Sequence, residues 1–218
     1  MKTNTKRLTT SAMLLALALV LELVSKAVVP NLPFGGQITL ASMLPVILIS
    51  YRYGMKWGFV SSFCYALMEM VVGMKNVTAA FQPGTFGDGV MVERALLMCA
   101  LDYLLAFTSL GLGGLFRGRL KNPAGELALG SGVALVGRYL CHVLSGAILY
   151  GAWAEWFFTQ EGFPAWGTAL TNALTPQALA WAYSAVYNGM YMAPEILITT
   201  LAALTLAKLP QTMGKGGE

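Results

Sequence analysis

Charged residues are scarce in this sequence, and cysteine and histidine are scarcer still. Asp, Glu, Lys and Arg make up 11% of the 218 residues, whereas soluble proteins carry about 25%. The cysteines, Cys64, Cys99 and Cys141, all lie in apolar stretches, which excludes a disulfide-stapled secreted domain. A hydrophobic content of 56% excludes intrinsic disorder. Together with a mean hydropathy of +0.63, this composition indicates an integral membrane protein.

Six apolar blocks are candidate membrane-spanning helices, since a bilayer core about 30 Å thick requires roughly 20 residues of helix. They cover residues 8–29, 38–50, 57–73, 90–116, 127–152 and 179–206. Polar residues dilute the start of the second block and Pro45 lies inside it, so we expect this segment to be short or bent and surrounded by other helices. The fold class predicted is an all-α membrane protein, a single domain over residues 1–218 that forms a bundle of six transmembrane helices.

The basic residues are distributed unevenly between the two sides of this six-span arrangement. Ten of the fourteen cations fall on one side, namely Lys2, Lys6, Arg7, Arg52, Lys56, Arg117, Arg119, Lys121, Lys208 and Lys215. The opposite side receives Lys26 and Lys75 together with Asp88, Glu155 and Glu161. The positive-inside rule therefore places both termini in the cytoplasm. The pI near 9.0 reflects this topology, and nucleic acid is not expected as a partner.

A cleavable signal peptide is the alternative interpretation of the N-terminus, because basic residues precede an apolar run there. That run is longer than the apolar core of a signal peptide and contains Glu22, so we favour a transmembrane helix. Two outer segments, 75–89 and 151–176, stand apart from the apolar blocks. The second is rich in Trp and Phe, which indicates either an interfacial aromatic belt or a lid over an outward-facing pocket.

Seven ionisable residues lie inside the predicted spans, where a charge is costly and marks a candidate functional site. They are Glu22, Glu69, Arg94, Asp102, Arg138, His142 and Glu195. We expect Arg94 to reach the outer interface and Arg138 to neutralise one of the acids.

Polar and aromatic residues also recur at a spacing of four on two predicted helices. One stripe holds Arg138, His142, Gly146 and Tyr150, and another holds Tyr183, Tyr187 and Tyr191. Asn188 is five residues from Tyr183, so a regular helix separates these two by about 140°. One pocket includes both only if it wraps around that helix or if the helix is irregular there.

An acid, an imidazole, an amide and several aromatic rings suit a small, flat, partly cationic ligand. The carboxylate of Asp102 would attract the positive charge of the ligand. Aromatic faces add cation–π attraction of roughly 0.5 to 2 kcal/mol each, and an amide forms hydrogen bonds with ring nitrogens. The structural alternative is that Asp102 and His142 bond only to each other and that the tyrosines mark the membrane interface.

The sequence lacks the motifs of common catalytic and nucleotide-binding sites. It has one histidine, no metal-binding Cys and His spacing, no Walker loop and no nucleophile elbow. We therefore expect no enzymatic activity and no metal or cofactor, and the energy for active transport must come from a gradient or a partner. Ala12 and Ala16 have the spacing that lets another helix approach closely, although internal packing is the commoner reason for it.

Several motifs follow one another in a defined order along nearly the whole chain. They are Gly-Gly-Gln-Ile-Thr-Leu at 35–40, Met-Leu-Pro at 43–45, Tyr-Arg-Tyr-Gly at 51–54, Leu-Asp-Tyr-Leu at 101–104, Gly-Gly-Leu-Phe-Arg at 113–117, Arg-Tyr at 138–139 with His142 and Gly146, and Tyr-Ser at 183–184 with Tyr-Asn-Gly at 187–189. In this order and spacing the chain resembles the thiamine-specific substrate-binding (S) components of energy-coupling factor (ECF) transporters.

The resemblance implies a six-helix protein of the bacterial plasma membrane that binds thiamine from outside with high affinity. It implies a transmembrane T component and two ATPase subunits as partners, and no cofactor. Matched residue by residue, the family's ligand-binding positions fall on Asp102, Tyr103, His142, Tyr150, Tyr183 and Asn188. The surface that meets the T component falls on Ala12 and Ala16.

The chain also departs from the family pattern. A family member has Glu in place of Asp102 and Trp in place of Tyr150 and near Gly36, so Trp153, Trp156 or Trp181 is expected to supply the missing stacking area, and we select Trp153. A hydroxymethylpyrimidine or riboflavin is the alternative ligand. The alternative class of protein is a stand-alone proton-coupled carrier that uses Glu22, Glu69 or Glu195, although six spans without a repeat suit alternating access poorly.

Overall fold

The computed structural model of the protein describes residues 2–30, 32, 36–86 and 91–209. All elements in these residues are helices: α1 (Lys2–Val28), α2 (Leu44–Tyr53), α3 (Met55–Val72), α4 (Met74–Ala80), α5 (Met91–Met98), the π-helix η2 (Cys99–Leu105), α6 (Ala106–Thr108), the 3-10 helix η3 (Ser109–Gly114), α7 (Pro123–Leu149), the 3-10 helix η4 (Gly151–Trp153), α8 (Ala154–Phe158), α9 (Trp166–Ala173) and α10 (Pro176–Leu206). Gly35, Asp88, Val90 and Lys215, which the sequence predictions used, lie outside the described residues.

Four helical stretches are long and apolar enough to cross a membrane: Asn4–Val28, Val92–Gly114, Pro123–Leu149 and Pro176–Leu206. A fifth candidate is the pair α3 and α4, which bends by 76° at Gly73. The helical class and the apolar helices of a membrane protein are therefore confirmed, whereas six membrane crossings remain a prediction.

The second predicted span is wrong in its bounds. Residues 36–43 are irregular, and α2 has only ten residues, which is roughly 15 Å of helix and about half of a bilayer core. Pro45 lies in the first turn of α2, where its missing N–H costs no hydrogen bond. Residues 44–51 of α2 are all buried, so the expectation of a short helix inside the bundle is confirmed.

Sequence signals at the N-termini of the two longest packed helices explain where they begin. The Asn122 side chain accepts from the backbone N–H of Ala124 at 3.0 Å, and Thr175 Oγ1 accepts from that of Ala178 at 3.4 Å. In both helices a proline follows the cap, which suits the first helical position. Both helices thus begin a few residues earlier than the apolar pattern predicts.

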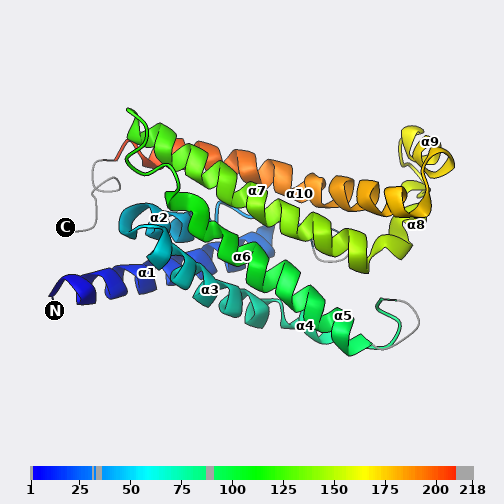
Figure 1. The fold of residues 1–218 in the computed structure, drawn as a ribbon, viewed down its shortest axis with the longest axis horizontal. Helices are drawn as coiled ribbons and strands as arrows, with labels where there is room; N and C mark the ends of the chain where they lie inside the picture. The colour runs from blue at the N-terminus through cyan, green and yellow to red at the C-terminus, as the bar shows by residue number, and fades with distance from the viewer. Residues whose placement is uncertain (1, 31, 33–35, 87–90, 210–218) are drawn as a thin grey trace.

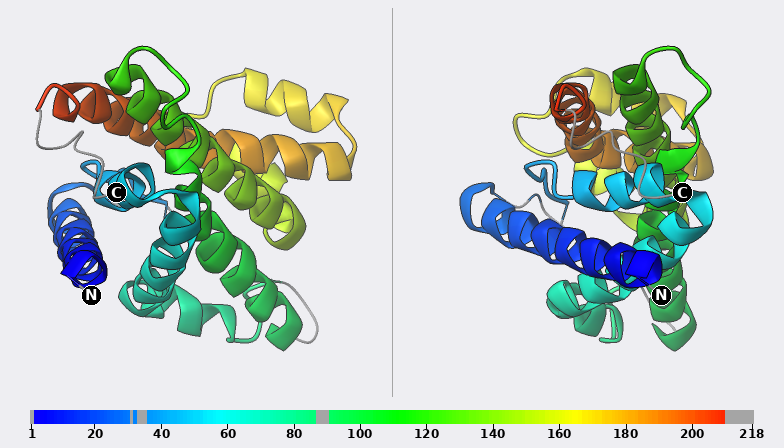
Figure 2. Two further views of the ribbon diagram at one scale, coloured as in Figure 1. Left: turned by 60° about the vertical axis from the view of Figure 1, so that its left-hand side comes forward. Right: turned by 90° about the vertical axis from the view of Figure 1, so that its left-hand side faces the viewer.

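The helices α7 and α10 run side by side for most of the length of the molecule (Figure 1). In contrast, α1 stands at the edge of the bundle against α2 and α3 (Figure 2). The start of α1 and the end of α10 lie at one end of the molecule, and α8 and α9 lie at the other (Figure 1). The space between the α7–α10 pair and the other helices contains the candidate site.

Candidate ligand-binding cavity

A cavity of about 460 Å³ lies between α1, the 36–39 segment, α3, α4, η2, α7 and α10. This volume is in the range of small-molecule sites. Its polar and aromatic lining consists of Glu22, Lys26, Gln37, Thr39, Glu69, Lys75, Asn76, Asp102, Tyr103, Phe107, Arg138, His142, Tyr150, Tyr183, Tyr187, Asn188 and Tyr191. Six of the seven predicted ligand-binding residues thus lie around one cavity, and Trp153 is the exception.

Asp102 and Tyr103 lie on the π-helical turn η2, a feature that the sequence did not predict. π-turns inside α-helices are rare and frequently coincide with functional sites. The wider turn presents both neighbouring side chains to the cavity. Asp102 accepts hydrogen bonds from Ser145 Oγ at 2.6 Å and from His142 Nδ1 at 2.8 Å, so its carboxylate is held between η2 and α7.

His142 lines the cavity and holds a buried acceptor nitrogen. Because Nδ1 faces the acidic oxygen of Asp102 at 2.8 Å, the proton of the neutral ring lies on Nδ1 and Nε2 carries the lone pair. Nε2 is buried and has no hydrogen-bond partner in the described part of the chain. A buried acceptor without a partner costs free energy, so a ligand N–H group at this position satisfies it.

Asn188 lines the cavity, but its amide is fully engaged by the protein. Its Nδ2 donates to the carbonyl of His142 at 3.2 Å and to the carbonyl of Ser184 at 2.8 Å, and its Oδ1 accepts from Tyr191 Oη at 2.6 Å. The amide therefore ties α10 to α7 and orients Tyr191. Its direct contact with a ligand remains a prediction.

Tyrosines of α10 form an aromatic wall of the cavity. Tyr183 and Tyr187 stack with ring centroids 5.9 Å apart, and Tyr187 and Tyr191 pack edge-to-face at 6.1 Å. Tyr150, at the C-terminal end of α7, faces Phe86 edge-to-face at 5.2 Å. Tyr183 and Asn188 both line the cavity although they are five residues apart on the continuous helix α10, which is the wrapped one of the two predicted alternatives.

Trp153 does not line the cavity. The 3-10 turn η4 follows α7 and carries the indole to the surface, where it is 38% exposed and packs edge-to-face on Trp156 at 5.8 Å. Trp156 and Trp166 are exposed as well, as in an aromatic belt. Phe157 contacts Tyr183 at 5.2 Å, so this outer segment supports the tyrosine wall and does not line the cavity.

Arg138 makes no direct contact with an acid in the described residues, so its expected neutralisation of one acid stays a prediction. Within the described residues the buried guanidinium forms no ion pair. It lies 4.6 Å from the ring centroid of Phe107, and Nη1 donates to the sulfurs of Met43 at 3.1 Å and Met192 at 3.5 Å. Arg138 thus supplies a positive charge at the cavity wall that aromatic and sulfur groups surround.

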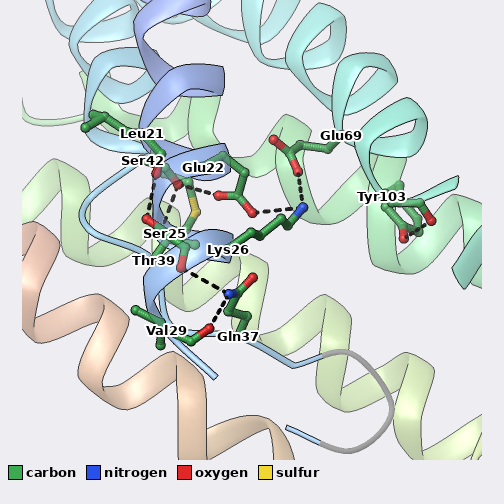
Figure 3. A network of polar contacts seen from close by, with 12 residues as sticks. Leu21, Glu22, Ser25, Lys26, Val29, Gln37, Thr39, Ser42, Glu69 and Tyr103 are labelled. Atoms are coloured by element: carbon green, nitrogen blue, oxygen red, sulfur yellow. Dashed lines mark hydrogen bonds and ion pairs between the residues drawn. The ribbon is translucent and has the colours of Figure 1, made fainter. Parts of the chain in front are cut away.

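The acids Glu22, Glu69 and Glu195 belong to polar networks near the cavity, and Figure 3 shows the first two. Lys26 Nζ lies 3.3 Å from Glu22 and 4.0 Å from Glu69. Glu195 accepts from the hydroxyl and the backbone N–H of Thr39. Lys26 was not predicted to be a cavity residue, although its spacing of four from Glu22 is the signal of an ion pair on a helix.

The sequence matches that of a known protein family over most of its length. The family model described as "Thiamine transporter protein (Thia_YuaJ)" matches residues 8–84 and 85–170. This chain belongs to the thiamine transporter protein family. The family is one of transporters, which confirms both the resemblance drawn from the ordered motifs and the expectation that the chain is not an enzyme.

Two relatives extend this family assignment over nearly the whole chain. The thiamine transporter ThiT of Bacillus subtilis (strain 168) is 27% identical over 209 residues, which cover 92% of this chain and 89% of the relative. A solved structure of ThiT from Listeria monocytogenes superimposes with a TM-score of 0.64 at 19% identity, covering 96% of this chain and 98% of that one. The structural superposition shows that this chain has the fold of ThiT.

Proposed function

We propose that this chain captures thiamine in the cavity between η2, α7 and α10 as the substrate-binding component of an importer. The observation that carries the proposal is the Asp102–His142 pair in the cavity lining, whose buried Nε2 has no partner in the described residues. Thiamine has an aminopyrimidine that donates N–H groups and a thiazolium that carries a positive charge. An acceptor nitrogen backed by a carboxylate matches the first group, and negative charge near aromatic rings matches the second.

The tyrosine wall supplies the stacking surface for the two flat rings. Tyr150, Tyr183, Tyr187 and Tyr191 line the cavity, and Tyr103 Oη donates to the carbonyl of Gly73 at 3.4 Å, which fixes its ring beside Asp102. Each aromatic face contributes roughly 0.5 to 2 kcal/mol of cation–π attraction when it meets the thiazolium.

We also propose that the chain crosses the plasma membrane six times as one unit of residues 1–218, with both termini in the cytoplasm. The distribution of basic residues supports this orientation. The shared position of the start of α1 and the end of α10 also supports it (Figure 1). In this topology α2 makes a short crossing within the bundle, and residues 36–43 complete it.

The partners proposed are a transmembrane T component and two ATPase subunits of an ECF complex. Ala12 and Ala16 support this proposal, because both are exposed on the edge helix α1, where small residues allow another helix to approach closely. Uptake of thiamine that depends on those subunits agrees with the proposal. Uptake by cells without them would instead identify a stand-alone carrier.

Calorimetric titration of the purified protein with thiamine tests the proposed ligand directly. None of the five tryptophans lines the cavity, so heat of binding is a more direct signal than tryptophan fluorescence. We expect saturable binding that Asp102→Asn weakens by about 10-fold to 100-fold, because a hydrogen bond to a charged group contributes about 1.5–3 kcal/mol.

A charge-matched control is Glu126→Gln, since Glu126 is buried away from the cavity and accepts from Tyr51 Oη at 2.9 Å. Its thiamine affinity should equal that of the wild type. Saturable binding of riboflavin, or of a hydroxymethylpyrimidine, without any binding of thiamine would contradict the proposed ligand while leaving the class of protein intact.

A further inference from the structure

One wall of the cavity is an irregular segment of the chain. Residues 36–43 are not helical, and Gly36, Gln37 and Thr39 of this segment line the cavity. Most of the segment is buried, and Thr39 is only 2% exposed. Irregular backbone inside an apolar bundle lacks the hydrogen bonds of a helix, so other groups must satisfy its N–H and C=O groups. The position of this wall therefore depends on the side chains that hold it.

The end of α1 holds one edge of the segment with neutral groups. Ser25 Oγ accepts from the backbone N–H of Leu40 at 2.8 Å, and the amide of Gln37 donates to the carbonyl of Val29 at 2.9 Å (Figure 3). These contacts fix the segment relative to α1 and leave its other edge, which faces α10, to other groups.

Glu195 of α10 holds that other edge with a single carboxyl group. Its Oε2 accepts from both donors of Thr39, the backbone N–H at 2.5 Å and Oγ1 at 2.7 Å, and its Oε1 accepts from Thr199 Oγ1 at 3.1 Å. All three partners donate, which suits an ionised carboxylate, and hydrogen bonds to a charged acceptor are strong. Glu195 is fully buried and is not among the residues that line the cavity. Its contact with the cavity wall runs through Thr39.

Glu195 depends on Thr39 in turn. Within the described residues Glu195 forms no ion pair, and a buried carboxylate is costly unless hydrogen bonds satisfy it. Moving Thr39 away would remove two of these three hydrogen bonds. The carboxylate and the segment therefore fix one another.

The backbone close to Thr39 is strained and needs groups that hold it. Ala41 has a φ of 55°, a left-handed conformation that residues other than glycine rarely adopt and that persists only where the surroundings fix it. Next to it, Ser42 Oγ donates to Glu22 Oε2 at 2.7 Å and lies 2.9 Å from Thr39 Oγ1. The turn at 39–42 is therefore held between a carboxylate of α10 and a carboxylate of α1.

We propose that Glu195 is a positioning residue of the ligand site, which sets the shape of the cavity by holding residues 36–39 in place without touching the ligand. This inference rests on the proposed function, because thiamine is the ligand whose affinity reports on that shape. Without the acceptor of Glu195, both donors of Thr39 lose their partner on α10, and the wall that carries Gln37 loosens. The cavity then fits the flat rings less closely, although every residue in its lining is unchanged.

Two substitutions of Glu195 separate its hydrogen bonds from its volume. Glu195→Leu fills about the same space but accepts no hydrogen bond, whereas Glu195→Gln keeps an acceptor for Thr39 and can donate to Thr199 Oγ1. We expect calorimetry to show thiamine binding about 10-fold weaker in Glu195→Leu and within about 3-fold of the wild type in Glu195→Gln. Amide hydrogen exchange measured by mass spectrometry should be faster at residues 36–43 in Glu195→Leu alone, with exchange in α7 unchanged.

Glu126→Leu is the matched control, because it removes a buried carboxylate that accepts from Tyr51 Oη and lies outside the cavity lining. Its thiamine affinity and its exchange at 36–43 should equal those of the wild type. Should Glu195→Leu fail to fold, Thr39→Val and Thr39→Ser take its place. The valine removes the hydroxyl donor and should weaken binding and speed exchange at 36–43, and the serine should restore both.

The assignment would be overturned by unchanged thiamine affinity or unchanged exchange at 36–43 in Glu195→Leu, or in Thr39→Val where that variant replaces it. Equal losses in Glu195→Leu and Glu195→Gln would also overturn it, and so would faster exchange in α7 as well as at 36–43, which indicates a general structural role. A wild-type protein that binds no thiamine would overturn the proposed function instead. Exchange at 36–43 in the ligand-free variants would then still decide whether Glu195 holds the segment.

Discussion

The two sides of the cavity are built on different principles. On the α7–α10 side, small residues let the helices approach and every polar group of Asn188 has a protein partner. On the α1–α3 side, a lysine that is partly exposed bridges two buried acids. The first side is held by direct contact between two helices, whereas the second side is held by an ion-pair bridge.

The burial of the helices separates α1 from α7 but hardly from α10. In the most apolar window of each helix, 22% is buried in α1, 28% in α10 and 44% in α7. The hydrogen bonds between α7 and α10 therefore make this side a preorganised surface, which lowers the entropic cost of ligand binding. The α1 side retains polar contacts that can rearrange, and it presents the helix on which partner binding is proposed. We therefore expect substitutions in α7 and α10 to change mainly the stability of the protein, and substitutions in α1 to change mainly its response to ligand and partners.

The largest effect on stability is expected from Gly146→Ala in α7. A Cβ at this position would lie 2.2 Å from Ser184 Oγ and 3.2 Å from Asn188 Nδ2, so α7 and α10 must move apart. Overpacking of this kind costs about 1–3 kcal/mol, which a lower Tm in detergent reports. Gly132→Ala on the same helix is the control, since a Cβ there meets nothing within 4 Å and gains helix propensity. A Gly146→Ala protein as stable as the control would contradict the tight α7–α10 contact.

A loss of similar size is expected from Asn188→Leu, which preserves approximate volume and removes the amide. The substitution leaves the hydroxyl of Tyr191 and the carbonyl of His142 without these partners, at a cost of about 1–3 kcal/mol for an unsatisfied buried group. Thermal unfolding of the single variants and of the double variant with Tyr191→Phe measures the coupling. Strictly additive losses would show that the Asn188–Tyr191 bond contributes nothing, because residues in contact are expected to couple.

The smallest effect on stability is expected from the double substitution Ala12→Leu and Ala16→Leu on α1. Both side chains are exposed, so unfolding free energy should change by no more than about 0.5 kcal/mol and thiamine affinity should stay constant. Uptake in cells that contain the partner subunits should be lost, because the bulkier face prevents close helix approach. Ala18→Leu, at a fully buried position of the same helix, should destabilise the protein instead. Normal uptake by the Ala12 and Ala16 variant would remove the docking role from this face.

Much of the fold could be predicted from the sequence because lipid imposes long apolar helices with clear starts. Asn122 and Thr175 mark two of those starts directly. The bounds of α2 could not be predicted, since residues 36–43 mix polar and apolar side chains and follow the surface of α10, where Gly36 N donates to Tyr187 Oη at 3.2 Å. A buried irregular segment has no periodic pattern that separates it from the start of a helix.

The candidate site was predictable where it depends on side-chain chemistry and unpredictable where it depends on helix irregularity. Asp102, His142 and the tyrosines were selected as costly or aromatic groups in apolar helices, and the structure brings them together. Trp153 was selected for its ring alone, and a 3-10 turn carries it to the surface. The role of Lys26 depends on how α1 meets α3, a tertiary contact that no local pattern specifies.

The π-helical turn η2 has a further consequence for changes in chain length. A π-turn closes its hydrogen bonds over five residues where an α-turn uses four, so Cys99–Leu105 holds the equivalent of a one-residue insertion. Removing one residue there would restore a continuous α-helix and rotate the segment from Met91 to Met98 by about 100° relative to α6. The contacts between the Met91–Met98 helix and its neighbours would then be out of register, while the contacts after Asp102 would be unchanged. The length of this span is therefore as constrained as its composition.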